Sequence, residues 1–147
     1  MKALFPAERA ELAEPLPGEG RVEHAVRIAG KAKRADARRC MLTYLAPAAR
    51  DGHPGAVAAG IAALGDPSRH VRYEACRLMA VAQDRAALPT LRAMQAEGAD
   101  VPYDGIEGAL LAIERGDRNA FFEAQGLGNT RLVLQDEGLD GSRMASG

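Results

Sequence analysis

Two stretches of the chain carry apolar side chains at matching helical positions, and each matched pair is 34 residues apart. The matched pairs are Ala37 with Val71, Met41 with Ala75, Tyr44 with Leu78 and Leu45 with Met79. We call this spacing one repeat period. One further period brings Ala109, Ala112 and Ile113 close to the corresponding places. A single helix pair of this size cannot bury its own apolar stripe, so the repeat predicts that successive pairs stack and share one core.

The segments around this repeat have helical rather than strand periodicity. Predicted helices begin near residue 21 and then cover 35–50, 54–64, 68–82, 84–97, 102–115 and 117–125, with short Gly, Asp and Pro turns between them. Pro47 lies inside the second helix and is expected to end or kink it. No segment alternates with period two for long enough to build a sheet. The predicted fold is all-α, a short α-solenoid of helix pairs.

Length and composition agree with one helical domain. A chain of 147 residues buries enough surface to fold without a disulfide or a metal, and its 30 alanines favour helix. The predicted organisation is an N-terminal arm or cap over 1–20, a repeat domain over 21–125 and a C-terminal tail over 126–147. The tail contains a loop at 126–129 and mild strand character at 131–134.

Charge and cysteine usage narrow the class of protein. The formal net charge is -1, so the whole chain has no general attraction to polyanions. No apolar run is long enough for a membrane span, and four glutamates interrupt the first 20 residues where a secretory signal would lie. Cys40 and Cys76 are expected to be reduced, packed thiols, with a disulfide between them as the alternative. These features predict a cytoplasmic protein with no membrane partner.

No motif for catalysis, metal binding or cofactor binding is present. His24, His53 and His70 are far apart and lack the spacing of zinc ligands. No nucleophile elbow or phosphate-binding loop occurs. The carboxylates of Asp100, Asp104, Glu107 and Glu114 fit a solvated helix face better than an acid–base pair. The expectation is therefore a noncatalytic protein without cofactor or metal.

One stretch resembles a known repeat family. The sequence ALGDPSRHVRYEA at 63–75 is similar to a HEAT repeat of the short type found in phycocyanobilin-lyase proteins, and ALPTL at 87–91 matches that type's next helix. The resemblance is specific over 63–92, although the period of about 34 is shorter than the ~40–47 residues usual for HEAT and armadillo repeats. It implies structural roles for Asp66 and Arg72, at the helix start and between neighbouring repeats.

The leading hypothesis for function is a protein–protein interaction module that acts as a scaffold or adaptor. The candidate contacts lie on the exposed side of the predicted helix 68–82: Arg69, Arg72, Tyr73 and Arg77. The partner would be another protein. A second copy of the chain is a further candidate, because residues 21–50 hold eight basic and two acidic side chains whereas residues 95–147 hold four and ten.

Two alternatives remain open. In the first, a basic stripe binds phosphate or nucleic acid, provided that one continuous helix aligns its members: Arg21, Arg27, Lys31, Arg34 and Arg38. Gly30 weakens that helix, and no aromatic residues interleave with the stripe. The second alternative, a bilin-lyase-like accessory enzyme, is implied by the family resemblance alone, because no sequence feature supports a bilin site.

Overall fold

The computed structural model describes residues 14–124, and over that range it contains helices and turns but no strand. The predicted all-α class is therefore confirmed for this part of the chain. The predicted tail and most of the predicted arm lie outside the described residues. The helices are α2 (Arg21–Lys31), α3 (Ala35–Arg50), α4 (Pro54–Ala63), α5 (Arg69–Ala82), η1 (Arg85–Ala87), α6 (Leu88–Glu97), η2 (Pro102–Asp104), α7 (Gly105–Arg115) and α8 (Ala120–Ala124).

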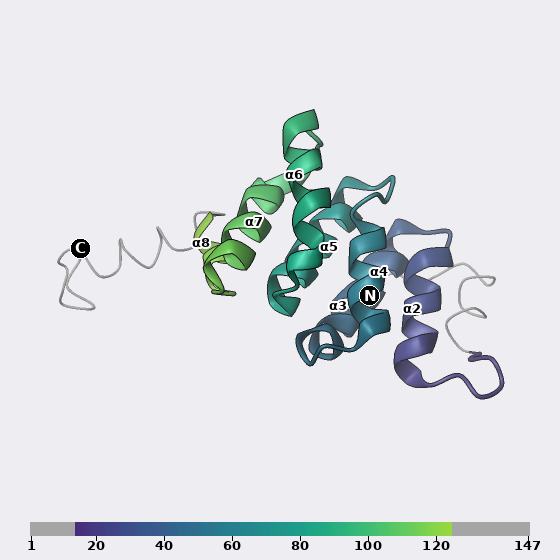
Figure 1. Cartoon of the computed structure of the whole chain (residues 1–147). Helices are drawn as coiled ribbons and strands as arrows, with labels where there is room; N and C mark the ends of the chain where they lie inside the picture. The colour runs from purple at the N-terminus through teal and green to yellow at the C-terminus, as the bar shows by residue number, and fades with distance from the viewer. Residues whose placement is uncertain (1–13, 125–147) are drawn as a thin grey trace, which may run out of the picture.

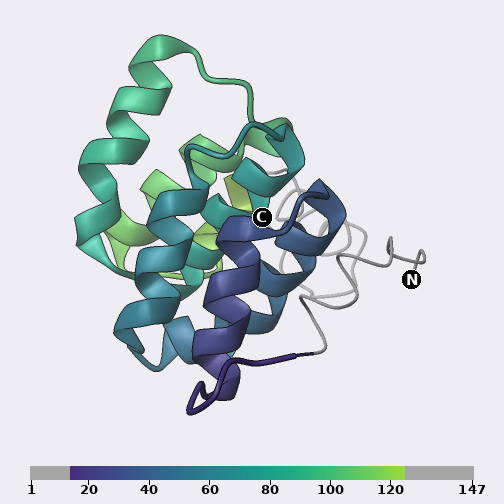
Figure 2. The same cartoon turned by 90° about the vertical axis from the view of Figure 1, so that its right-hand side faces the viewer.

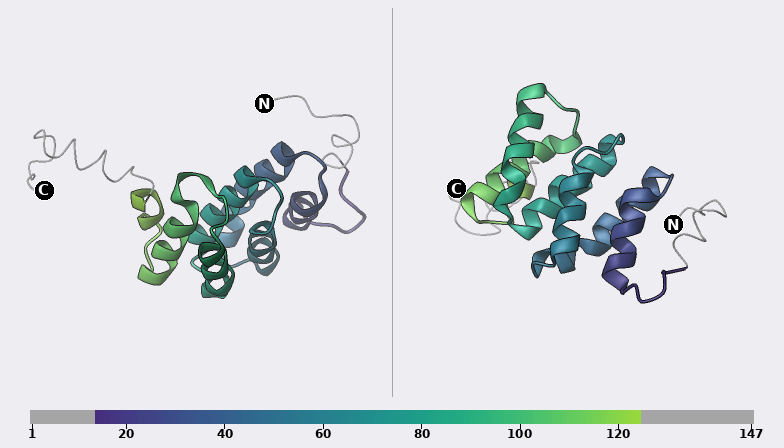
Figure 3. Two further views of the ribbon diagram at one scale, coloured as in Figure 1. Left: turned by 90° about the horizontal axis from the view of Figure 1, so that it is seen from above. Right: turned by 45° about the vertical axis from the view of Figure 1, so that its right-hand side comes forward.

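The helices follow one another in a row that runs from α2 at one end to α8 at the other (Figure 1). Helices α3, α5 and α7 are successive neighbours, and we call them the second-helix layer. Helices α2 and α4 contact each other on the opposite side of the row, and α6 packs on α7. Figure 2 looks along the row from the α2 end, and Figure 3 shows that the order in space follows the order in sequence.

Short polar side chains define where helices begin. Ser68 accepts a hydrogen bond from the backbone N–H of Val71 and caps α5, and Asp84 accepts one from Ala86 at the start of η1. His53 caps α4 through Nδ1, which accepts from two backbone N–H groups at 3.1 and 3.3 Å. Each cap satisfies donors that a helix start leaves without intrahelical partners.

Of the two outcomes expected at Pro47, an end or a kink of the helix, the end does not occur. Helix α3 continues through Pro47 to Arg50, and the proline ring is exposed. The carbonyl of Pro47 accepts from the backbone N–H of Asp51 at 3.1 Å, and that of Ala48 accepts from His53 at 2.9 Å. These bonds complete the final turn, and the carbonyl that the missing proline donor leaves without a helical partner belongs to Thr43, an exposed residue.

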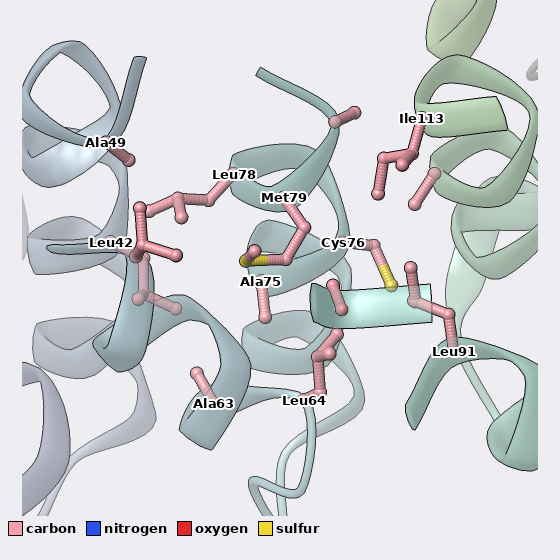
Figure 4. Packing of buried hydrophobic residues seen from close by; sticks show 14 of the residues in the cluster. Leu42, Ala49, Ala63, Leu64, Ala75, Cys76, Leu78, Met79, Leu91 and Ile113 are labelled. Carbon is pink, nitrogen blue, oxygen red and sulfur yellow. The ribbon is translucent and has the colours of Figure 1, made fainter. Parts of the chain in front are cut away.

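The core is built around α5. Leu78 and Met79 lie on the side of α5 that faces Leu42 of α3, whereas the sulfur of Cys76 points toward Leu91 of α6 (Figure 4). All five of these side chains are at most 1% exposed. Alanines make up many of the other buried side chains, and these small groups let the helices pack closely.

Gly60 and Gly30 provide a matched test of this packing. A Cβ on Gly60 would overlap the Leu78 side chain and stand 2.7 Å from Met79 Sδ, whereas nothing lies within 4 Å of one on Gly30. We expect Gly60→Ala to lower the free energy of unfolding by about 1–2 kcal/mol through overpacking. Gly30→Ala should raise it by about 0.5–1 kcal/mol, because alanine is the better helix former. Urea unfolding followed by circular dichroism measures both, and a stabilised Gly60→Ala variant would contradict the packing described here.

Candidate protein-binding face

Burial repeats with the same period across the three helices of the second-helix layer. The positions that are buried in all three helices are Ala37, Val71 and Gly105; Leu42, Cys76 and Leu110; and Leu45, Met79 and Ile113. The register therefore extends to α7, where the sequence match is weak. It follows that side chains one period apart occupy equivalent places on neighbouring helices.

Arg38 and Arg72 are such an equivalent pair, and their guanidinium groups make matching hydrogen bonds. Nη1 of each donates to the carbonyl oxygens six and five residues earlier, at 2.8 and 3.1 Å in both cases. Nε and Nη2 reach 28 residues forward, from Arg38 to the Asp66 carboxylate and from Arg72 to the Asp100 carbonyl oxygen. Each arginine thus joins the loop before its own helix to the loop before the next helix in the layer. We call Arg38 and Arg72 the two arginine anchors.

The Asp66 carboxylate is the most enclosed part of this network. Its side chain is 8% exposed and that of Arg38 is 13% exposed. Burial acts to raise the pKa of Asp66, but hydrogen bonds from Arg38 and from the Ser68 N–H, with the charges of both anchors, hold it below its ordinary value of 3.8. Ionised Asp66 therefore stabilises the folded chain at neutral pH, and this stabilisation is lost as the pH falls through the lowered pKa.

Asp66→Asn tests this role. At pH 7 we expect the free energy of unfolding to fall by about 2 kcal/mol, because the substitution removes a charge-assisted acceptor from a nearly buried arginine. Below the ordinary pKa of Asp66 the difference from the wild-type chain should shrink, because the unfolded chain then binds a proton at this carboxyl more readily than the native chain does. Urea unfolding at pH 7 and pH 3 measures both.

Asp100→Asn is the matched control, because Asp100 lies one period after Asp66. Its carboxylate pairs with Arg69, and the two side chains are 62% and 47% exposed. Removal of an exposed pair changes stability little, and the Asp100 carbonyl that binds Arg72 remains. Equal losses for the two variants would contradict the anchor role of Asp66.

The outer surface of α3, α5, η2 and α7 forms one face, which we call the second-helix face. Arg39, Tyr73 and Glu107 follow one another at one-period intervals and so make a row across it. Arg39 and Glu107 are exposed and Tyr73 is half-buried. Beside this row, Thr43 Oγ1 of α3 donates to Glu74 Oε1 of α5 at 3.4 Å.

Tyr103 is the most exposed large apolar side chain within residues 14–124, at 67%. Its ring meets that of Tyr73 edge-on, with centroids 5.5 Å apart and an interplanar angle of 78°. Tyr103 and Asp104 both adopt left-handed backbone conformations, with φ of 58° and 53°. This conformation costs about 1–2 kcal/mol for each residue with a Cβ, so packing must hold the strained turn in place. As a result α7 begins at Gly105, later than the sequence predicted.

Two glycines of α7 make room for the aromatic rings behind Tyr103. A Cβ on Gly105 would stand 3.1 Å from Cδ1 of Tyr73, and one on Gly108 would stand 3.0 Å from both Cδ1 and the carbonyl oxygen of Phe121. The rings of Tyr73 and Phe121 have centroids 5.7 Å apart. Bare backbone on this side of α7 therefore lets rings from α5 and α8 pack closely and support the η2 turn.

The structure places three of the four predicted protein-binding residues around this turn. Arg69 pairs with Asp100 at 2.7 Å, Arg72 donates to backbone carbonyls, and Tyr73 contacts Tyr103. Arg77 lies one turn further along α5, 3.6 Å from Glu74. Tyr103 was missed by the sequence reasoning, although its setting in the turn sequence PYDG, residues 102–105, was a usable signal.

The continuous helix that the basic stripe requires does not form. Helix α2 ends at Lys31 and α3 begins at Ala35, because Ala32 and Arg34 have extended backbone with ψ of 139° and 136°. Arg21 and Lys31 are exposed. The other three members are engaged in ion pairs: Arg27 with Glu19, Arg34 with Asp36 and Arg38 with Asp66. The prediction of an aligned stripe is therefore wrong.

Of the four acidic residues from Asp100 to Glu114 that the sequence singled out, two form ion pairs within residues 14–124 and two do not. Glu114 pairs with Arg92 at 2.8 Å, as Asp100 does with Arg69. Asp104 and Glu107 are exposed. Within residues 14–124, no three His, Cys, Asp or Glu side chains cluster closely enough to hold a metal ion. Among the helices described over the same range, none combines the length and apolarity needed to cross a bilayer.

Comparison of the chain with protein-family models, curated protein sequences and solved structures gave no match.

The two cysteines are free thiols in different surroundings. Cys40 is half-buried, whereas Cys76 is buried on α5 with its sulfur toward Leu91 of α6 (Figure 4). Burial, with a smaller effect from the Glu107 carboxylate, raises the pKa of the Cys76 thiol to about 12. Cys76 is thus a packing residue, because reaction requires the thiolate.

We expect one cysteine of the folded chain to react readily with an aromatic disulfide reagent at pH 8. Cys40 should react within minutes, and Cys76 only when urea unfolds the chain and exposes it. Cys76→Ala leaves the fast reaction unchanged and Cys40→Ala removes it. Fast reaction of both thiols in the folded chain would contradict the burial of Cys76.

Proposed function

We propose that the chain is a noncatalytic protein-binding module that recognises its partner through the second-helix face. In this proposal the helix pairs form a short solenoid of HEAT-like repeats. The repeated burial pattern and the equivalent bonds of the two arginine anchors support that arrangement. Stacked helix pairs of this kind present one extended surface built from successive helices, which suits binding to another protein.

The observation that carries the proposal is the exposure of Tyr103 on a strained turn. Tyrosine and arginine are enriched among the residues that dominate protein interfaces, because they bury a large area and also form polar contacts. Tyr103 is 67% exposed, and the exposed Arg69–Asp100 ion pair lies next to it. Contact between a large apolar ring and water is unfavourable, and a partner that covers the ring would remove that contact.

The turn is also held rigidly, which favours specific binding. Arg72 donates two hydrogen bonds to the Asp100 carbonyl, at 3.1 and 2.7 Å, just before the turn. Gly105 packs against Tyr73 just after it. A side chain that is held in place before binding loses less conformational entropy when a partner arrives.

Tyr103→Ala tests the proposal, with Tyr44→Ala as a control because Tyr44 is similarly exposed, at 52%, but lines a pocket beside α2 with His24 and Ile28. The tagged full-length chain is used for affinity capture from a lysate treated with nuclease. We expect a protein captured by the wild-type chain and by Tyr44→Ala to be reduced about tenfold or more with Tyr103→Ala, as for an interface anchor. Equal capture by all three chains, or capture that nuclease abolishes, would contradict the proposal.

A further inference from the structure

We infer that the partner recognised by the second-helix face is a second copy of this chain, related to the first by a two-fold axis. This inference rests on the proposed binding function and specifies its partner. It follows from how charge is distributed over the three helices of the layer, because the face carries opposite charges on its two sides.

The unpaired charges of the face lie on its outer helices. On α5 the arginines are matched within the chain, Arg69 by Asp100 and Arg77 by Glu74. The side chains of Arg39 on α3 and Glu107 on α7 are exposed and form no hydrogen bond or ion pair with other residues of the described range. The wider surroundings have the same polarity, since 21–50 holds eight basic and two acidic residues and 95–124 holds two and seven.

These positions are self-complementary. The row Arg39, Tyr73 and Glu107 runs positive, aromatic, negative across the face. A two-fold axis parallel to α5, in the plane of contact near Tyr73, places a second copy face to face and reverses the order of its row. Arg39 of each copy then meets Glu107 of the other, so one dimer contains this contact twice. Asp104 of each copy meets the other's Arg34–Asp36 ion pair.

A two-fold arrangement pairs both charged sides of the face with opposite charges, so the assembly is complete with two chains. A head-to-tail arrangement would leave one charged side of each terminal copy open and would extend into longer assemblies. A standard protein interface covers roughly 800 Å² on each partner, about a tenth of the 8002 Å² accessible surface of this molecule. Burial of Tyr103 at the edge of such a contact would also remove its exposed ring from water.

Sedimentation equilibrium of the full-length chain, at low salt and over a range of concentrations, tests the inference. We expect the wild-type chain to form dimers that dissociate more readily as salt screens the contacts. Arg39→Glu and Glu107→Arg should each raise the dimer dissociation constant about a hundredfold, because each places like charges together twice per dimer. Arg85→Glu, at an exposed arginine of η1, should leave it unchanged.

A mixture of the two charge variants provides the decisive measurement. In a heterodimer of Arg39→Glu with Glu107→Arg, both contacts again join opposite charges. We therefore expect an equimolar mixture to form dimers with near wild-type affinity, and the double variant to dimerise with itself. Circular dichroism of each variant checks that its fold is intact.

Three results would overturn the inference: a wild-type chain that stays monomeric, charge variants that dimerise as wild type does, or a mixture that fails to recover dimers. Assemblies that grow beyond two chains would replace the two-fold contact with a head-to-tail one. If the chain is monomeric while Tyr103→Ala still loses a captured protein, the binding function stands and only the second copy is wrong. If dimers form but capture does not depend on Tyr103, the proposed recognition through that turn fails instead.

Discussion

The placement of the helices depends on the hydrogen bonds of the two arginine anchors. A loop that precedes a helix exposes backbone carbonyls, and each such group needs a partner when the next helix pair packs over it. One guanidinium has five donors in a planar array, so it satisfies two carbonyls behind it and an acceptor 28 residues ahead at the same time. Lysine lacks this geometry. The repeat period is therefore set by polar satisfaction in the loops as well as by apolar packing between the helices.

Helix α7 has no arginine anchor, and the missing anchor accounts for the course of the loop that exposes Tyr103. The position one period after Arg72 is Ile106, which is buried at 4% exposure. An isoleucine cannot bind the carbonyls of the preceding loop, so that loop takes a different course through η2. Tyr103 and Asp104 adopt left-handed conformations in it, and the aromatic ring projects outward. The most exposed aromatic side chain of the described range thus lies where the repeat departs from its own pattern.

Features that depend on neighbouring residues were predictable from the sequence, and features that depend on distant ones were not. Helix positions belong to the first group, because apolar spacing and capping residues such as Ser68 act over a few neighbouring residues. The continuation of α3 past Pro47 belongs to the second, because it depends on whether carbonyls near the end of the helix find other donors. The break between α2 and α3 belongs to the first group, because the predicted helix over 35–50 already begins after it. The exposure of Tyr103 depends on a three-dimensional relation, because Ile106 cannot donate to the loop before its own helix as Arg38 and Arg72 do.

The arginines of this chain accordingly fall into two groups with different consequences. Those bound to carbonyls or enclosed carboxylates, as Arg38 and Arg72 are, hold the helices together and have few donors left for a ligand. Arg39 is adjacent to Arg38 in sequence but is exposed to solvent, and its equivalents are Tyr73 and Glu107. Positions that keep the same chemistry from one period to the next therefore specify the fold, whereas positions that change it give the face its polarity. Recognition is expected at the second kind of position, where a substitution alters binding without removing a structural bond.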